Sequence, residues 1–263
     1  MAGTDLGPND ILWDDLFYVT PQGGVRMKEQ HPILFRRFMA PCDIFEYKGF
    51  AIKYFVEDRE IELTELAGDC SVKIYGHILK FDVGPDNESR KVGLVMEIGR
   101  SLQDYVKQAD EAEKHRIKDE MIAIVERLHK EYNMVHGDIK PQNFLICNDG
   151  KIRFCDFEAA RPLTESLEIW EGLEELALNK AYTYNYINKM RSQFVPPTED
   201  DDWYALAISI WEIFTGKVPF EGIENEEIVS RHSTGQTVDL TEVKDIETRE
   251  WIRDIIQKGG ALV

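Results

Sequence analysis

Short hydrophobic runs, each broken by turn-forming residues, characterise the first third of the chain. Val, Ile, Phe and Tyr dominate these runs, which is typical of β-strands. The stretch CDIFEYKGFAIKYF, residues 42–55, predicts a β-hairpin whose turn is Lys48-Gly49. One short helix is predicted in this region, over EDREIELTELAG, residues 57–68, and Gly68 is expected to end it.

From Ser101 onward, apolar residues recur with the 3.6-residue period of an α-helix. Over residues 113–132 this period places five apolar side chains on one face: Ile117, Met121, Ile124, Val125 and Leu128. A second helix is predicted for YALAISIWEIF, residues 204–214. It is too short to span a membrane and contains Glu212, so a buried helix is the better interpretation.

This change of period predicts an α+β fold with two lobes. Residues 1–97 are expected to form a small antiparallel β-sheet with one short helix, and residues 98–263 a larger, mainly helical lobe. A chain of 263 residues that is 43% hydrophobic can bury a core of this size, so the two lobes are expected to form one domain.

The chain is strongly acidic, with a formal net charge of −18. Nucleic acid and anionic membrane surfaces are therefore excluded as expected partners, because nothing would neutralise their phosphates broadly. A solvated acidic surface that aids solubility is the simplest explanation. A basic partner or substrate is the alternative.

Four cysteines are spaced without any C-x-x-C pair, so we expect reduced thiols and no disulfide. Cys147 and Cys155 lie in apolar, strand-like runs that are typical of core thiols. The N-terminal residues MAGTDLGPND do not combine a basic and an apolar region, so no signal peptide is predicted. Together these features predict an intracellular protein, cytoplasmic or nuclear. The oligomeric state stays open.

The candidate chemistry lies in HGDIKPQN, residues 136–143, and in Asp156, which follows the strand-like run KIRFC. Phosphoryl transfer requires metal ions on the phosphates, a group that orients the acceptor and nearby positive charge. Asp138 has the chemistry to accept the acceptor proton, and Lys140 to contact the γ-phosphate. Asn143 and Asp156 offer the oxygen ligands that Mg²⁺ prefers.

The stretch LHKEYNMVHGDIKPQNFLI, residues 128–146, resembles the catalytic helix and loop of the eukaryotic protein kinase family. The spacing to Asp156 also agrees with that family, and the match spans most of the chain. The resemblance implies a two-lobed protein-kinase-like fold that uses ATP and Mg²⁺. Lys140 points to the serine/threonine branch. His136 is expected to be structural, packing in the core beside Phe157.

Further stretches resemble the nucleotide-binding parts of the family. FAIKYF is similar to the strand that bears the ATP-binding lysine, LVMEIG to the hinge, and DDWYALAISIWEIFTGKVPF to the central helix of the large lobe. The resemblance implies that Asp202 braces the catalytic loop, although a simple helix cap is the alternative. It also implies nucleotide contacts from Lys53, from Ala51 over the adenine, from Met96 as gatekeeper, from the backbones of Glu97 and Gly99, and from Leu145 beneath the adenine.

Two departures from the family pattern concern the small lobe. HPILFRRFMAPCDIFEYKG, residues 31–49, contains no glycine before Gly49, so no glycine-rich loop precedes Lys53 and ATP is expected to bind weakly or in an unusual pose. The helix after Lys53 is short. Its lysine-pairing glutamate is either Glu60 or Glu62, and Glu60 is favoured.

Two further departures concern the large lobe. Asp156-Phe157-Glu158 replaces the family's DFG, and Gly137 replaces an arginine, so a fixed segment without switching by phosphorylation is expected. No APE motif is found. The amphipathic stretch within residues 163–180 is expected to pack against the large lobe, and a docking helix is the alternative.

The leading hypothesis is an ATP- and Mg²⁺-dependent, serine/threonine protein-kinase-like enzyme that transfers the γ-phosphate to a hydroxyl acceptor, with a protein substrate. One alternative is a pseudokinase, a binding module without turnover. Another is a small-molecule phosphotransferase, because HGD followed by DFE also resembles the aminoglycoside and choline kinases. The acceptor and the regulation stay open.

Overall fold

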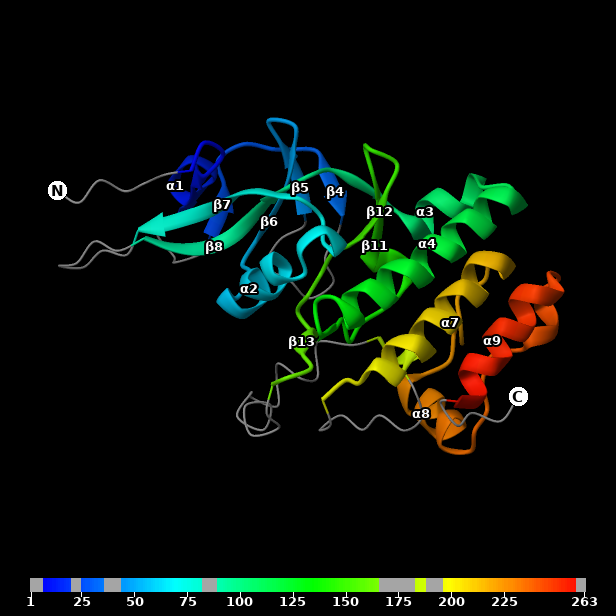
Figure 1. The fold of residues 1–263 in the computed structure, drawn as a ribbon. Helices are drawn as coiled ribbons and strands as arrows, with labels where there is room; N and C mark the ends of the chain where they lie inside the picture. The colour runs from blue at the N-terminus through cyan, green and yellow to red at the C-terminus, as the bar shows by residue number, and fades with distance from the viewer. Residues whose placement is uncertain are drawn as a thin grey trace. The chain divides into compact units, whose positions relative to one another are not determined.

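The computed structural model describes residues 7–19, 25–35, 44–81, 89–165, 183–187 and 196–258 (Figure 1). The chain forms two compact units. The first comprises Met1–Glu65 with Ser71–Gly99, and the second Leu66–Cys70 with Arg100–Val263. Residues 36–43 of the stretch without a glycine-rich loop, which include Cys42, and most of the amphipathic stretch 163–180 lie outside the described residues.

A six-stranded sheet, in the order β1-β7-β8-β6-β5-β4, organises the first unit. Its strands are β1 (Ile11–Leu12), β4 (Ile33–Phe35), β5 (Ile44–Tyr47), β6 (Phe50–Tyr54), β7 (Ile74–Phe81) and β8 (Ser89–Met96). The pairs from β7 to β4 are antiparallel, as predicted, whereas β1 joins the edge of β7 in parallel. The parallel edge strand was not predicted, because two residues carry no detectable period.

The predicted hairpin is formed by β5 and β6, and its turn is Lys48-Gly49. Both turn residues have positive φ, 51° at Lys48 and 81° at Gly49. This backbone matches the twist of paired strands, and glycine adopts it without steric cost. The turn sets the register of β5 against β6, and β6 pairs on its other side with β8, where Ala51 lies opposite Met96 and Lys53 opposite Leu94.

The N-terminal segment covers one face of this sheet. It contains β1, helix α1 (Trp13–Leu16), β2 (Phe17–Val19) and β3 (Val25–Met27), and β2 pairs with β3. Trp13, Leu16 and Phe17 are buried in a cluster with residues of the sheet, including Phe45 and Tyr54. Burial of these large side chains stabilises the unit, since each fully buried one contributes about 1.5–3 kcal/mol. No element was predicted here from the sequence.

Helix α2 (Asp58–Leu66) follows β6 directly and buries Glu60, Ile61, Leu63 and Thr64. It ends two residues before Gly68, which was the predicted end. Gly68 instead begins the short helix η1 (Gly68–Cys70), with φ of 55°. Its left-handed conformation is the one in which glycine commonly ends a helix, so the predicted end agrees with the structure to within two residues.

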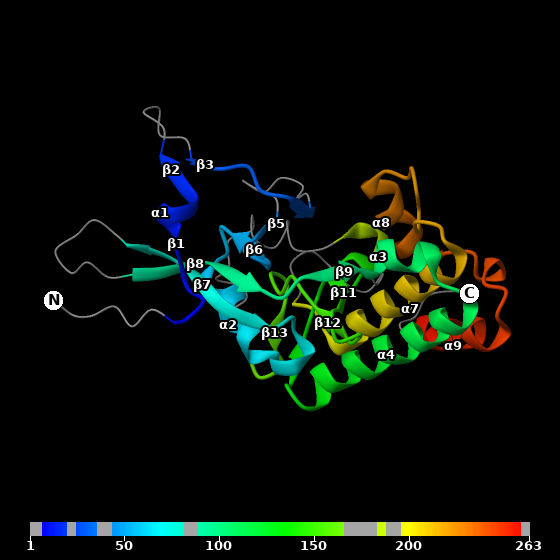
Figure 2. The same ribbon diagram turned by 90° about the horizontal axis from the view of Figure 1, so that it is seen from above.

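Long helices dominate the second unit. They are α4 (Glu111–Lys130), α7 (Glu199–Thr215), α8 (Asn225–Ser233) and α9 (Ile246–Lys258), and α7 lies between α4 and α9 (Figures 1 and 2). The five apolar residues predicted to share one face of α4 are all buried. Helix α7 is buried over most of its length, as predicted. A capping box between Thr198 and Asp201 begins it, and Gly216 with φ of 68° ends it.

Short strands carry the loops between α4 and α7. β10 (Met134–Val135) pairs with β13 (Arg161–Pro162), and β11 (Phe144–Cys147) pairs with β12 (Ile152–Phe154). β9 (Gly99–Ser101), where the chain enters the second unit, completes a three-stranded sheet with β11 and β12. Helices α3 (Leu102–Tyr105) and η2 (Val106–Gln108) follow β9. The described residues also form the short helices η3 (Pro141–Asn143), η4 (Tyr184–Tyr186) and η5 (Leu240–Glu242).

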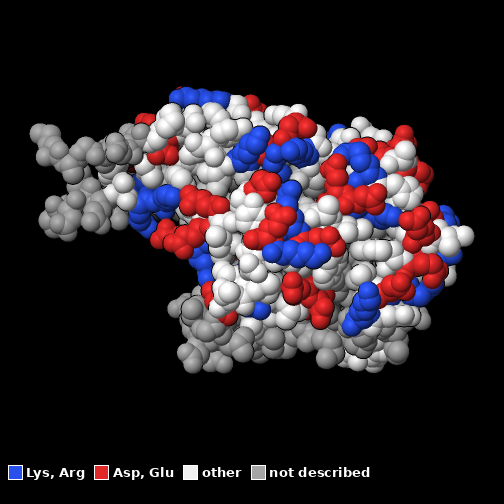
Figure 3. Space-filling model, in the orientation of Figure 1, with Lys and Arg blue, Asp and Glu red and all other residues white. Residues whose placement is uncertain are grey.

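Acidic and basic side chains are intermixed on the face of the molecule drawn in Figure 3. Cys70, Cys147 and Cys155 are free thiols, which agrees with the expectation for these three residues. None of the helices in the described part of the chain combines the length and the apolar character that crossing a membrane requires.

Candidate functional site

Asp138 lies at the centre of a compact polar cluster in the second unit, between β10 and η3. Its Oδ2 atom accepts hydrogen bonds from Lys140 Nζ at 2.5 Å and from Asn143 Nδ2 at 3.0 Å. Its Oδ1 atom accepts from the backbone N–H of Thr183 at 3.1 Å and from the Thr183 hydroxyl at 3.2 Å. The structure thus brings together the three loop residues named from the sequence and adds Thr183.

Lys140 is a cation bound to two partners. Its Nζ atom donates to Asp138 and, at 2.8 Å, to the Thr183 hydroxyl oxygen. Burial alone would lower the pKa of Lys140, but the charge of Asp138 and the hydrogen bond to it outweigh burial and raise the pKa above its ordinary value. A fixed positive charge therefore lies beside the Asp138 carboxylate at neutral pH.

Thr183 was not found by sequence reasoning. It lies 45 residues beyond Asp138. The stretch before it contains no motif from which a contact with Asp138 could be predicted. Thr183 is positioned by η4, where the buried Tyr186 hydroxyl donates to Glu212 of α7 and Asn185 Nδ2 donates to the Pro219 carbonyl. Burial raises the pKa of Glu212 above its ordinary value. These contacts fasten the segment 183–187 to the second unit and so hold Thr183 against Asp138.

Asp202 braces the loop, as the resemblance implied. Its carboxylate accepts from the backbone N–H groups of His136 at 2.8 Å and Gly137 at 2.9 Å, and it lies 2.9 Å from His129 Nε2. The alternative of a helix cap is wrong, because Thr198 caps α7. Asp202 thereby ties α7 and α4 to the loop that presents Asp138.

Gly137 is required by the backbone at this point. Its φ is +80°, and a Cβ atom there would lie 2.5 Å from the Ala159 carbonyl oxygen. An arginine at this position, as in the family pattern, would demand a local shift of the backbone. Glycine in place of this arginine was expected to remove switching by phosphorylation. It also allows the segments that contain Gly137 and Ala159 to approach each other closely.

His136 is a core residue, as predicted. It is fully buried, and its ring lies 5.0 Å from Phe157 and 4.7 Å from Phe154 between ring centroids. Burial lowers the pKa of His136, which favours the neutral ring. A neutral ring protonated at Nε2 satisfies both of its contacts, since Nε2 lies 3.1 Å from the Cys155 carbonyl and Nδ1 accepts from the Asp138 N–H.

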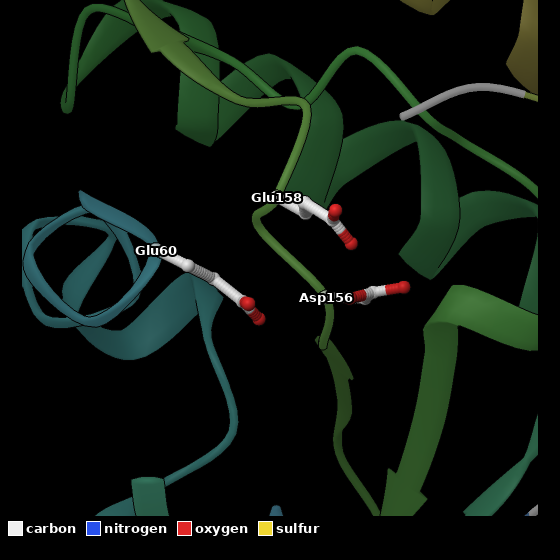
Figure 4. A group of neighbouring side chains, drawn as sticks. All are labelled: Glu60, Asp156 and Glu158. Atoms are coloured by element: carbon white, nitrogen blue, oxygen red, sulfur yellow. The ribbon is translucent and has the colours of Figure 1, made fainter. Parts of the chain in front are cut away.

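Asn143 and Asp156 were named as metal ligands, and their backbones lie close together because Cys155 N donates to the Asn143 carbonyl at 3.0 Å. The Asn143 amide nitrogen donates twice to Asp138, so its Oδ1 atom is turned away from that carboxylate. Asp156 has φ of 67°, an uncommon backbone for a residue other than glycine. Its carboxylate oxygen lies within 4.8 Å of one from Glu158 (Figure 4).

These donors fit a hard divalent cation, since they are carboxylate and amide oxygens. Sequence reasoning treated Glu158 only as a substitute for glycine. Its exposed carboxylate adds a third oxygen donor within the second unit. Figure 4 also labels Glu60, which belongs to α2 of the first unit.

In the first unit, Lys53 of β6 forms a buried ion pair with Glu60 of α2. The side chains are 4% and 6% exposed, so both charges are largely removed from water and their attraction offsets part of that cost. Glu62 is exposed, so the choice left open by the sequence is decided in favour of Glu60. A lysine on a strand is ordinarily a surface residue. Pairing with Glu60 offsets part of the cost of placing the Lys53 charge inside the unit.

Four of the residues named for adenine contacts, Ala51, Met96, Glu97 and Gly99, lie in the first unit, at the end of the sheet and just beyond it. Ala51 of β6 is buried and directly opposite Met96 of β8. Glu97 donates its N–H to the Lys73 carbonyl at 2.9 Å, so any hydrogen bond from its backbone to an adenine would use its carbonyl oxygen. Gly99 begins β9, and half-buried Leu145 lies on β11 in the second unit.

Comparison with known proteins places this geometry in a family. Residues 58–259 match the protein kinase domain. A probable serine/threonine-protein kinase of Clostridium acetobutylicum is 29% identical over 63% of this chain and 25% of its own length. The serine/threonine-protein kinase PrkC of Bacillus subtilis is 26% identical over 60% of this chain and 24% of its own. The probable serine/threonine-protein kinase PknB of Lactococcus lactis is 26% identical over 57% and 23%.

The chain thus spans about a quarter of the length of these relatives' sequences. The matched range begins at Asp58 and so does not include Ala51 and Lys53. Evidence for a role of these two residues therefore comes from their contacts in the structure. These relatives are protein kinases, and they lend no support to the resemblance to aminoglycoside and choline kinases.

Proposed function

Since the chain belongs to the protein kinase domain family, we propose that it transfers the γ-phosphate of ATP, with Mg²⁺, to a serine or threonine hydroxyl of a protein. The single observation that carries this proposal is the cluster around Asp138, in which Lys140, Asn143 and Thr183 all donate to one carboxylate. These donors hold the carboxylate in one orientation, which a group that positions an acceptor hydroxyl requires.

In the second unit, Asp138 orients the acceptor hydroxyl and accepts its proton as the oxygen attacks the γ-phosphorus, while the bond from that phosphorus to the β,γ-bridging oxygen breaks and ADP leaves. Lys140 supplies positive charge beside the migrating phosphoryl group. Asn143 Oδ1 and the Asp156 carboxylate would hold Mg²⁺, which neutralises phosphate charge when bound. Asp202 holds the loop backbone in place through the His136 and Gly137 N–H groups. Leu145 contributes an apolar contact to the adenine.

In the first unit, Lys53 neutralises phosphate charge, and Glu60 keeps its ammonium group in position. Ala51 and Met96 provide apolar contacts to the adenine, and the backbones of Glu97 and Gly99 provide hydrogen bonds to its edge. The roles assigned in this unit follow from the resemblance of FAIKYF and LVMEIG to the family's strand and hinge.

Thermal unfolding with ATP alone, Mg²⁺ alone and both tests the nucleotide site. A ligand present at about 100 times its dissociation constant stabilises the fold by about 2.7 kcal/mol. We expect a shift of the midpoint that requires both components, that Asp156→Asn abolishes and that the matched control Asp254→Asn retains, since Asp254 is exposed on α9. No shift at millimolar nucleotide would contradict the proposal.

Transfer of labelled phosphate from ATP to a basic test protein and to small alcohols then tests the reaction itself. We expect transfer to the protein and none to the alcohols. Nucleotide binding without transfer to any acceptor would instead favour the pseudokinase, and transfer to alcohols alone would favour a small-molecule kinase.

A further inference from the structure

A cavity of about 490 Å³ lies in the first unit. Its walls are formed by side chains of α1, of the strands β6, β7 and β8, and of the segment that leads from β6 into α2. Its volume falls within the range of small-molecule sites, roughly 300–1,000 Å³. None of the residues proposed above to contact nucleotide, metal or acceptor lines it, so the proposed reaction gives this cavity no role.

Two basic residues lie opposite each other on the strands that line the cavity. Lys80 of β7 pairs directly with Arg90 of β8 in the antiparallel ladder, and both line the cavity. Like charges directly opposite each other on paired strands are destabilising. An anion bound between the two side chains would offset this repulsion. Two opposed cations are thus the arrangement expected of an anion site, all the more in a chain whose formal net charge is −18.

Other charged residues that line the cavity limit where an anion fits. Lys91 is one of them, but its Nζ atom is bound by Glu65 at 2.9 Å, so its charge is already compensated. Glu57 and Asp58 line the cavity where α2 begins, and both are exposed. Their carboxylates offset the partial positive charge of the helix N-terminus. An anion therefore fits at the sheet and not at the start of α2.

Aromatic side chains line the cavity beside these cations. Lys80 Nζ lies 4.7 Å from the centroid of the Trp13 ring, and the ring centroids of Tyr54 and Phe55 are 4.3 Å apart. A ligand that carries a ring next to its anionic group can therefore contact both kinds of side chain. Trp13 precedes residues 58–259, which match the protein kinase domain. The match to the family thus does not account for this wall of the cavity.

Phe55 has an uncommon backbone for a bulky residue. Its φ is 54°, in the left-handed region, and 42% of the residue is exposed. Burial of so exposed a side chain offsets little of this strain. Strained residues of this kind cluster at ligand sites, where they place a side chain against the ligand. Phe55 therefore gives a second, independent indication that the cavity is a site.

We propose that this cavity binds a small aromatic phosphate monoester, with its phosphate between the two opposed cations and its ring against the aromatic side chains. A phosphate dianion can accept hydrogen bonds from Lys80 and Arg90 at once, and the planar guanidinium matches the spacing of phosphate oxygens. A carboxylate carries a single charge and would use the opposed pair less fully. The ring gains stacked or edge-to-face contacts with the aromatic wall.

Fluorine NMR of the protein labelled with fluorotryptophan tests the site locally. Trp13 lines the cavity, and Trp211 of α7 lies in the second unit as an internal reference. The spectrum of Trp13→Phe assigns the Trp13 resonance among those of the five tryptophans. Phenyl phosphate, inorganic phosphate and phenol are titrated separately. We expect phenyl phosphate to shift the Trp13 resonance alone, with a dissociation constant about tenfold below those of inorganic phosphate and phenol.

Substitution of the opposed cations tests the anion contact. Lys80→Gln and Arg90→Gln should each weaken binding of phenyl phosphate about tenfold, the loss typical of one charge-assisted hydrogen bond. Arg90 is exposed, so its substitution leaves the core intact, and unfolding midpoints without ligand check that both variants are folded. Arg231→Gln is the matched control, since Arg231 lies on α8 and pairs with Glu227. It should bind phenyl phosphate as the wild type does.

Several outcomes would overturn the proposal. One is a Trp13 resonance that does not respond to millimolar phenyl phosphate, and another is equal affinity in wild type, Lys80→Gln and Arg90→Gln. Phenol binding as tightly as phenyl phosphate would show that the cations contribute nothing, and inorganic phosphate binding as tightly would show the same of the aromatic wall. None of these measurements involves phosphate transfer, so the cavity site and the proposed kinase reaction can fail independently.

Discussion

The polar cluster of the second unit and the ion pair of the first unit hold their charges in different ways. Asp138 is surrounded by Lys140, Asn143 and Thr183, so its carboxylate has four hydrogen bonds from three residues. Lys53 and Glu60 form a more deeply buried ion pair, with side chains 4% and 6% exposed, against 19% and 11% for Lys140 and Asp138. The comparison teaches that the two ion pairs differ in their exposure to solvent, so that losing one charge should cost more stability in the more deeply buried pair.

The largest expected effect is on catalysis at the cluster. Asp138→Asn keeps the shape of the side chain but removes the base, so phosphate transfer should fall about 10³-fold, or ~4 kcal/mol. Initial rates of transfer to a basic test protein measure this, with Asp254→Asn as the control. A rate within twofold of wild type would show that Asp138 does not accept the proton.

The next largest expected effect is on stability, when the charge of one lysine is removed from each unit. The loss of unfolding free energy should be larger in the first unit. Lys53→Met removes the lysine charge beside the buried Glu60 carboxylate and should cost about 3 kcal/mol of unfolding free energy. Lys140→Met should cost about 1 kcal/mol, because Asn143 and Thr183 still donate to Asp138. Denaturant unfolding measures both.

The double variant Lys53→Met/Glu60→Leu sharpens the same comparison. Because it removes both charges, it should recover most of the stability lost in Lys53→Met. Equal losses in Lys53→Met and Lys140→Met would contradict the contrast between the deeply buried ion pair and the more exposed one.

A third effect concerns acid stability and should arise in the second unit. His232 is 4% exposed, and its Nε2 atom is buried without a hydrogen-bond partner among the described residues. Burial lowers the pKa of His232 to about 4 from 6.5. The unfolded chain binds a proton below about pH 6.5 and the folded chain does not, so stability falls as pH decreases from there towards 4, by about 2–3 kcal/mol.

Unfolding of wild type and His232→Leu across this pH range measures the effect. The variant should lose part of the acid destabilisation, whereas the control His115→Gln should keep it. Identical pH dependence in wild type and His232→Leu would mean that the ring is protonated in the folded protein.

The smallest expected effect is at Thr183. Thr183→Val removes the hydroxyl between Lys140 and Asp138 but keeps the backbone N–H bond to Asp138. Transfer should slow about fivefold, or ~1 kcal/mol. Thr241→Val, at an exposed position on η5, is the matched control. A loss as large as that of Asp138→Asn would show that the cluster depends on one bond and is not distributed.

Local patterns predicted much of this protein. The turn at Lys48-Gly49, the buried face of α4 and the buried α7 all follow from residues a few positions apart, whose spacing is set by backbone geometry. The polar loop could be predicted in the same way, because Asp138, Lys140 and Asn143 lie within six residues. Such features need no knowledge of distant contacts.

Other features were decided only by tertiary structure. The N-terminal segment has elements of two to four residues, too short for any period, yet Trp13, Leu16 and Phe17 fill the core because the sheet face needs cover. Thr183 reaches Asp138 across 45 residues. Glu60 and Glu62 are equivalent in sequence, and only the direction in which α2 faces the sheet makes one buried and the other exposed. A contact between residues far apart in the sequence cannot be predicted from their spacing, because only the tertiary fold brings them together.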